Sequence, residues 1–258
     1  NAEIRKRAAL AAGRIGDEKA IGTLSALLAG DPSQDVRAMA AFAIGEIESI
    51  NGSDAILGIL DRDCRPAGTD SSVVARAAEA AGKIAAANSK DERSKTLGKA
   101  ILAVLDFEHD KRSRAFDDIV MLSLTAVLRA RPEGGTDSVK NFLRYSDPRI
   151  VADALNTLTR LRAKNANSEV RVLLSTHKDA VVRSNAARVL GAAEDKDSFD
   201  PLLAAATGDP DLRVRVAAIR SLASLKDVRA AERLIARGNE MLIPVHGDPA
   251  PLRPGQKV

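Results

Sequence analysis

Aromatic residues and cysteine are scarce in this chain of 258 residues. It has no tryptophan, one tyrosine and one cysteine, and aromatic residues make up only 2% of the sequence. A lone cysteine, Cys64, excludes an internal disulfide bond and says nothing firm about the compartment. The core therefore has to be built from alanine, leucine, valine and isoleucine, and small side chains let helices approach closely.

Long hydrophobic runs are also missing. No apolar stretch reaches the roughly 18 residues that a membrane-spanning helix needs. The chain begins with Asn1, already inside a helical pattern, and no signal peptide is recognisable. We expect a segment of a longer protein, from which any targeting signal would be missing, and the sequence leaves the compartment open.

The charge balance is only mildly basic. The chain has 39 basic and 35 acidic residues, which gives a net charge of +4. Most of these charges are expected on the solvated faces of helices. The excess becomes informative about a partner only if it gathers on one surface.

A short phrase recurs along the chain. Residues 36–45 reappear closely as residues 4–13 and 182–191, and weaker copies begin at Val73, Ile119, Ile150 and Val214. The copies are thus anchored at positions 4, 36, 73, 119, 150, 182 and 214. Self-similarity at such a period is typical of a solenoid, in which each unit packs only on its neighbours.

Each anchor begins a helix with a wide apolar stripe. The positions 4, 5, 7, 8 and 11 residues after the anchor are almost wholly apolar or small, which is typical of a helix sandwiched between neighbours. Second helices, such as residues 20–28 and 198–206, lie between the anchored ones. The pattern predicts an all-α superhelix of about seven helical hairpins over residues 1–237. Two insertions, 61–72 and 88–118, interrupt the period, and residues 238–258 form a proline-rich tail or linker.

The repeated phrase resembles a known family. Asp35-Val36-Arg37, followed by Ala40 and Ala43-Ile44-Gly45, is similar to HEAT repeats of the short, PBS-lyase-like type. The resemblance covers about residues 2–237. It implies a ladder in which the arginine after each anchor pairs with neighbouring acids. The positions concerned are Arg5, Arg37, Arg183 and Arg215, whereas valine replaces the arginine in the middle three repeats.

A second likeness concerns the start of the chain. The segment from Arg5 to Asp17, together with residues 39–42, resembles bacterial chains that join HEAT repeats to a cyclophilin-type prolyl isomerase domain. It implies that the proline-rich tail leads into a further domain. No residue of an isomerase site can be assigned in this chain.

Enzymes with HEAT-like repeats offer alternative functions. Deoxyhypusine hydroxylase-like proteins bind iron through His-Glu pairs, but His109, His177 and His246 are not followed by glutamate. HEAT-like DNA glycosylases use tryptophan, which is absent here. Bilin lyases share the repeat type, so a pigment or small-molecule enzyme stays open, although no cleft with convergent polar groups can be located in the sequence.

No catalytic motif stands out. The chain has no glycine-rich phosphate loop, catalytic-triad signature or paired-cysteine zinc spacing. The segment 106–110 carries ligand-type residues and is interpreted as a charged loop or helix end, with a divalent ion as the alternative. We therefore expect no catalytic residues, no metal and no cofactor.

The polar positions of the anchored helices form a candidate binding surface. Residues 3, 6 and 10 positions after each anchor share one helix face and are expected to gather on the concave side of the array. Only three are acidic, namely Glu46, Glu79 and Asp153, against eight cations. The cations are Arg7, Arg14, Arg76, Lys83, Arg129, Arg160, Arg188 and Arg220. This bias predicts an acidic peptide or protein as partner, unless the cations pair between adjacent repeats.

An apolar patch lies on the same predicted surface. Met39 and Phe42, with Leu10 in the neighbouring repeat, could anchor a partner, or Phe42 could turn inward to fill space left by alanines. Nucleic acid is a competing partner, because several cations could track phosphates, but only Phe42 offers a stacking surface. The sequence favours a non-catalytic protein-interaction scaffold and leaves its oligomeric state open.

Overall fold

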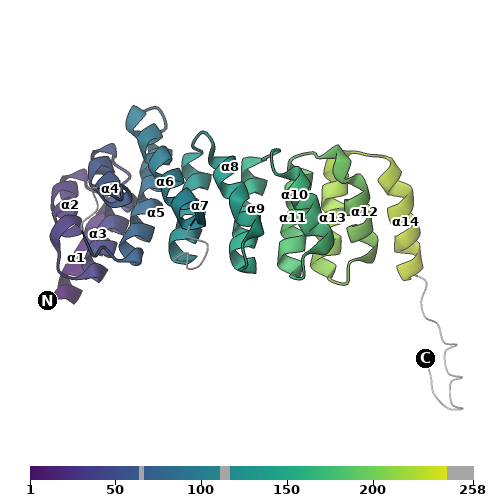
Figure 1. The fold of residues 1–258 in the computed structure, drawn as a ribbon, viewed down its shortest axis with the longest axis horizontal. Coiled ribbons are helices and arrows are strands. Elements are labelled where there is room, and N and C mark those ends of the chain that lie inside the picture. Colours follow the sequence, from purple (N-terminus) through teal and green to yellow (C-terminus); the bar gives the residue numbers. More distant parts are fainter. Residues whose placement is uncertain (64–66, 111–116, 243–258) are drawn as a thin grey trace, which may run out of the picture.

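Two rows of helices make up the molecule. The computed structural model describes residues 1–63, 67–110 and 117–242, and Figure 1 shows its helices following one another along one long axis. The inner row consists of α1 (Ala2–Ile15), α3 (Gln34–Ile47), α5 (Ser71–Ala87), α7 (Asp117–Ala130), α9 (Pro148–Leu161), α11 (Ala180–Ala192) and α13 (Leu212–Leu225). The outer row consists of α2 (Ile21–Gly30), α4 (Ser53–Leu60), α6 (Glu92–Asp110), α8 (Gly135–Lys140), α10 (Asn167–Thr176), α12 (Phe199–Gly208) and α14 (Arg229–Leu242).

The predicted all-α hairpin array is confirmed. Each anchor lies on an inner helix, each inner helix packs on the next, and no strand occurs among the described residues. The helical repeats continue further than expected, because the last helix, α14, ends at Leu242 instead of near residue 237. The remaining tail, like Cys64, lies outside the described residues.

Glycine lets neighbouring inner helices approach closely. In four repeats the residue nine positions after the anchor is a glycine that faces a small residue of the next inner helix. The facing pairs are Gly13 with Ala43, Gly45 with Ala80, Gly82 with Ala126, and Gly191 with Ser221. A Cβ atom built on any of these glycines would lie under 3.0 Å from the partner residue. On α7 and α9 this position holds Leu128 and Thr159, so the stacking of α9 on its neighbours lacks this close contact.

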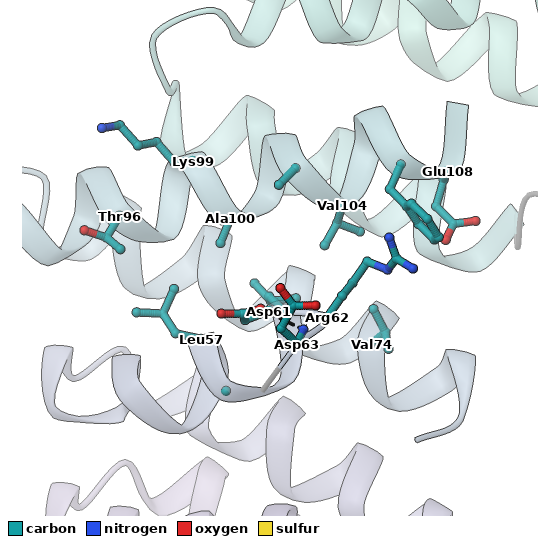
Figure 2. A pocket seen from close by; sticks show the side chains of 14 residues that line it. Leu57, Asp61, Arg62, Asp63, Val74, Thr96, Lys99, Ala100, Val104 and Glu108 are labelled. Atoms are coloured by element: carbon teal, nitrogen blue, oxygen red, sulfur yellow. Dashed lines mark hydrogen bonds between the residues drawn. The ribbon is translucent and has the colours of Figure 1, made fainter. Parts of the chain in front are cut away.

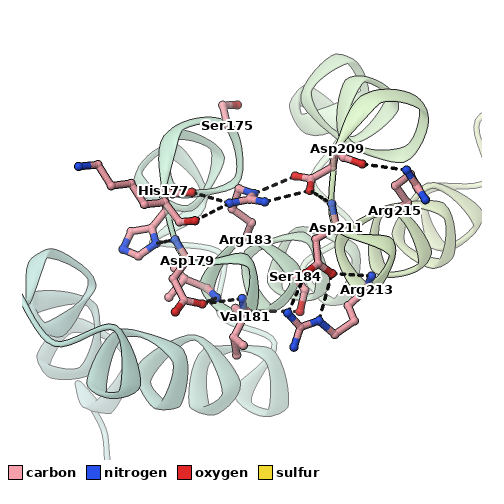
Figure 3. Close-up of polar contacts among 12 residues, drawn as sticks. Ser175, His177, Asp179, Val181, Arg183, Ser184, Asp209, Asp211, Arg213 and Arg215 are labelled. Carbon is pink, nitrogen blue, oxygen red and sulfur yellow. Dashed lines mark hydrogen bonds and ion pairs between the residues drawn. The ribbon is translucent and has the colours of Figure 1, made fainter.

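In the four repeats where an arginine follows the anchor, this arginine contacts the ends of outer helices. Figure 3 shows the guanidinium of Arg183 donating to the carbonyl oxygens of His177 and Lys178 and to both carboxylate oxygens of Asp209, at 2.8–2.9 Å. His177 and Asp209 are the residues that end α10 and α12. Unpaired carbonyls at a helix end attract cations, so one arginine satisfies one outer helix and pairs with the acid that ends the next.

The expected ladder of acids is only partly present. Arg5 pairs with Asp31 in the same way that Arg183 pairs with Asp209. Arg37 instead donates to the carbonyl of Leu28 and to the hydroxyl of Thr69, and Arg215 donates to the backbone carbonyl of Asp209. The prediction overlooked the backbone carbonyls, which accept from these arginines wherever an outer helix ends beside them.

An Asp-x-Arg motif starts several helices. In each copy the aspartate accepts a hydrogen bond from the backbone N–H of the arginine and also pairs with its guanidinium. The copies are Asp91 with Arg93 before α6, Asp147 with Arg149 before α9, Asp211 with Arg213 before α13, and Asp227 with Arg229 before α14. The side-chain hydrogen bond from the arginine lowers the pKa of Asp211 and of Asp227 to about 2.

Acid should therefore destabilise the array. A carboxylate whose pKa is lower in the folded than in the unfolded state stabilises above its ordinary pKa near 4 and loses this effect as pH falls towards 2. We expect the melting temperature to hold between pH 7 and 5 and to fall from pH 4 to pH 2, measured by circular dichroism. D211N/D227N should melt lower at pH 7 and show a shallower acid decline. A stability maximum near pH 3 would show that the aspartates of the Asp-x-Arg motifs are not the cause of the acid sensitivity.

Both ends of the inner row expose faces that interior repeats bury. The anchor residue is buried in every inner helix except α1, where Ile4 is 68% exposed, and Ile15 on the same face is also exposed. At the other end, α13 exposes Leu212, Val216 and Ile219. In the other repeats, the residue equivalent to Ile219 is buried against the following inner helix.

Candidate functional site

The predicted binding strip lies on one face of the inner row. Its eleven residues come from all seven inner helices, and ten of them are exposed or half-buried. They are Arg7, Leu10 and Arg14 on α1, Met39 and Phe42 on α3, Arg76 and Lys83 on α5, Arg129 on α7, Arg160 on α9, Arg188 on α11 and Arg220 on α13. The exception is Lys83, whose side chain is 8% exposed.

In the N-terminal half of the strip three of the four cations pair with acids; Arg7 pairs with Glu3, and Arg14 is exposed. Lys83 pairs with Glu46 and Glu79 at 2.6 and 2.7 Å, and Arg76 pairs with Glu79 at 2.6 Å. Burial alone would raise the pKa of Glu79, but hydrogen bonds from Lys83 and Arg76 lower it below its ordinary value. Lys83 thus differs from the expected open cation, because it pairs with two of the strip's three acids, Glu46 on the neighbouring α3 and Glu79 on its own helix.

An apolar hollow lies beside these ion pairs. It has a volume of about 350 Å³, with Leu10, Ala38, Met39 and Phe42 as its apolar lining; Lys6, Asp35, Ser72 and Arg76 supply the polar lining. We call this set the inner hollow. Met39 is half-buried and also packs against the core, and Phe42 is half-buried. Both residues thus contribute to the surface, and neither alternative drawn from the sequence describes them fully.

Phe42 is embedded among cations. The ammonium of Lys83 lies 4.4 Å and the guanidinium carbon of Arg76 lies 5.5 Å from the centroid of its ring. Cations at such distances are attracted to the negative face of the ring. The contacts hold the side chain at the edge of the hollow and orient Arg76 beside the opening.

In the C-terminal half the strip keeps its positive charge. Arg129, Arg160, Arg188 and Arg220 are all exposed, and within the described part of the chain none pairs with an acid. We call these four residues the basic row. Arg188 has only a hydrogen bond to Asn185, at 3.3 Å. Since the row takes one arginine from each of four successive inner helices, it runs along the array.

One acid shares this part of the strip. Asp153 is half-buried on α9, and burial raises its pKa above the ordinary value. Arg129 and Arg160 lie in the last turns of α7 and α9, where the negative end of the helix dipole also stabilises a cation. These two arginines therefore also stabilise the ends of their own helices.

A second cavity lies between outer helices α4 and α6. It has a volume of about 660 Å³, and Leu57, Ala100, Val104 and Phe107 supply much of its apolar lining. Figure 2 shows Arg62, which follows α4, reaching across to α6, where its guanidinium carbon lies 3.6 Å from the centroid of the Phe107 ring. Sequence reasoning missed this cavity, although the two insertions that flank it were recognised.

The cavity between α4 and α6 shows no catalytic arrangement among the described residues. Its polar groups include Lys99, Asp63 and the buried Glu108, and no hydrogen-bonded nucleophile and base lie together among the described residues that line it. Nor does the described part of the chain bring three His, Cys, Asp or Glu side chains into a metal-binding group. The segment 106–110 is the last part of α6, where His109 packs edge-on against Phe142 at 5.7 Å.

The helices show no membrane span. Within residues 1–63, 67–110 and 117–242, no helix is both long and apolar enough to cross a bilayer.

Known proteins place the chain in a family. The HEAT-repeat profile matches residues 1–67 and 167–240, which is more than half of the chain. The chain therefore belongs to the HEAT-repeat family. No curated protein sequence matches it significantly.

Solved structures agree with this fold. An engineered protein is similar with a TM-score of 0.57 at 19% identity, covering 80% of this chain and 96% of that one. A HEAT-like repeats protein from the archaeon Thermococcus onnurineus has a TM-score of 0.51 at 14% identity, covering 91% and 98%. The complex of CpcE and CpcF of phycocyanin lyase from Nostoc sp. has a TM-score of 0.50 at 19% identity, covering 93% and 90%. At these identities the similarity shows the fold alone.

Proposed function

We infer that the chain is a non-catalytic protein-interaction scaffold that binds an acidic segment along its inner helices. The observation that carries this proposal is the basic row, four exposed arginines from successive inner helices without acidic partners among the described residues. Surface arginines that stay unpaired can form charge-assisted hydrogen bonds with carboxylates of a partner. The extended, rigid array provides a long surface on which to present them.

The spacing of the basic row suits an extended peptide. Neighbouring packed helices lie about 10 Å apart, so four of them span roughly 30 Å. An extended chain advances about 3.3 Å per residue, so about ten residues cover this distance. An aspartate- and glutamate-rich segment of that length could reach all four arginines at once.

A quadruple substitution tests the proposal. R129Q/R160Q/R188Q/R220Q should bind a fluorescein-labelled glutamate-rich peptide of about 12 residues roughly 30-fold more weakly than the wild type. This corresponds to about 0.5 kcal/mol for each lost exposed ion pair. Fluorescence anisotropy at a fixed salt concentration measures the affinity, and raising the salt should weaken wild-type binding.

The matched control removes the same charge elsewhere. K19Q/K90Q/K164Q/K178Q changes four exposed lysines that lie outside the inner helices, so it lowers the net charge equally. It should bind the peptide nearly as well as the wild type. Equal losses in both variants would show that binding follows net charge alone and would overturn the proposal.

Nucleic acid is the competing ligand in the same experiment. Of the described aromatic residues only Phe42 comes from an inner helix, and its ring already has two cations close by. Binding of single strands usually needs several stacking aromatics. An oligothymidylate of equal charge should therefore bind no better than the peptide, and a much tighter complex with it would favour nucleic acid.

A further inference from the structure

The inner hollow and the basic row lie on the same face but differ in chemistry. The hollow combines Leu10, Met39 and Phe42 from α1 and α3, whereas the basic row begins on α7. Between them, the ion pairs of Lys83 on α5 cancel the local charge. The strip thus runs from an end with an apolar hollow, next to the exposed Arg7 and Arg14, through a neutralised middle to a cationic end.

The hollow has the size and lining of a side-chain pocket. A volume of about 350 Å³ accommodates one large apolar side chain and leaves room at its opening. Met39 supplies a flexible, polarizable wall that adapts to different shapes, and Phe42 supplies a rigid one. Arg76 lines the opening, where its guanidinium could lie flat on an aromatic ring that enters.

The surroundings of the hollow are open to solvent. Lys6 and Asp35 form an ion pair of 3.0 Å at its edge, and the carboxylate of Asp35 is 73% exposed. Exposed pairs contribute little to stability, so a ligand could displace this one at small cost. The hollow is therefore an accessible recess, and filling it would remove apolar surface from water.

We propose that the partner segment is bipartite, with one large apolar anchor residue in the inner hollow and an acidic stretch on the basic row. This rests on the proposed function. From α3 to α7 is two helix steps, or about 20 Å, which an extended peptide spans with about six residues. The neutralised middle would be crossed by uncharged residues, since acids there would face Glu46 and Glu79.

The absence of tryptophan from the chain makes a direct test possible. A peptide with a single tryptophan anchor, six uncharged residues and then an acidic stretch would contain the sole tryptophan of the complex. Binding should shift its emission to the blue, and the affinity should exceed that of the same peptide with serine at the anchor by about tenfold. The gain in affinity from joining two binding segments is largest when the linker matches the distance between their sites. Peptides with two or twelve linking residues should therefore show a smaller gain in affinity from the tryptophan anchor than the peptide with six.

Variants of the hollow complete the test. L10S and F42S change two different helices, and each should abolish the blue shift and the tenfold gain while the serine-anchor peptide binds as before. L203S, which alters a half-buried leucine of outer helix α12, serves as the control and should bind both peptides normally. Thermal melts establish that each variant is folded, and the comparison of the two peptides on the wild type does not depend on any variant.

The outcomes separate the two proposals. If the acidic stretch binds but tryptophan adds nothing at any linker length, the bipartite arrangement is wrong and the scaffold proposal stands. If the acidic stretch itself fails to bind, both are wrong. If the order of anchor and acidic stretch makes a difference, the tighter order gives the direction of the bound segment and supports the proposal.

Discussion

Replacing Gly82 with alanine should lower the free energy of unfolding by about 1–3 kcal/mol, the usual range for overpacking a core. A Cβ atom at this position would lie 2.6 Å from the Cα and 2.7 Å from the Cβ of Ala126 on α7. Because a Cα atom and an alanine Cβ atom are both fixed by the backbone, no side-chain rotation relieves the contact, and α5 and α7 must move apart. The expected loss is the net value, after the gain of about 1 kcal/mol from the higher helix propensity of alanine.

The same substitution elsewhere should have the opposite sign. Gly58 lies inside α4, and a Cβ atom built there meets nothing within 4 Å. Gly58→Ala should therefore raise the free energy of unfolding by about 0.5–1 kcal/mol. Urea unfolding followed by circular dichroism measures both variants. If both glycines respond alike, close helix approach does not govern stability in this array.

Asp209→Asn should cost about 2 kcal/mol. The Asp209 carboxylate and the Arg183 guanidinium form two hydrogen bonds, and the two side chains are only 7% and 13% exposed. The substitution keeps the shape but removes the charge that compensates a largely buried cation. Two backbone carbonyls still accept from Arg183, so the loss should stay below that of a fully orphaned buried charge.

The chain contains a comparison pair for this prediction. Arg5 and Asp31 have the same two-bond geometry, but the Arg5 side chain is 38% exposed. Asp31→Asn should therefore destabilise less than Asp209→Asn. A double-mutant cycle with R183Q isolates the coupling to Asp209, and its absence would show that the carbonyls alone hold Arg183.

The periodic part of the structure could be predicted from the sequence. The spacing of the anchors and the small residues that follow them define which helix faces pack, because each repeat has the same pattern of apolar positions and packs on its neighbours in the same way. Ala40, Ala77 and Ala186, each four residues after its anchor, are fully buried, as the apolar character of this column indicates, whereas the equivalent Ala8 in the first repeat is exposed.

Charge pairing between repeats was harder to predict. Whether Lys83 faces Glu46 depends on how far α5 slides along α3, and the sequence fixes the column but not this offset. The signal was nevertheless present, since two of the three acids on the strip lie within reach of one lysine. The cavity between α4 and α6 arises from the two insertions. Their conformation could not be predicted, because they have no counterpart in the other repeats.

The exposed faces of α1 and α13 bear on how the array loses its structure. Each interior inner helix packs against an inner helix on both sides, whereas among the described residues α1 and α13 have such a neighbour on one side, and Ile4 and Ile219 are exposed. In a nearest-neighbour array the opening of one unit removes support only from the next. In an isolated polypeptide of these 258 residues, opening should thus begin at α1 and α13 and advance inward. The inner hollow, which takes Leu10 from α1, would then open early, whereas the extensive contact between α5 and α7 should persist longest.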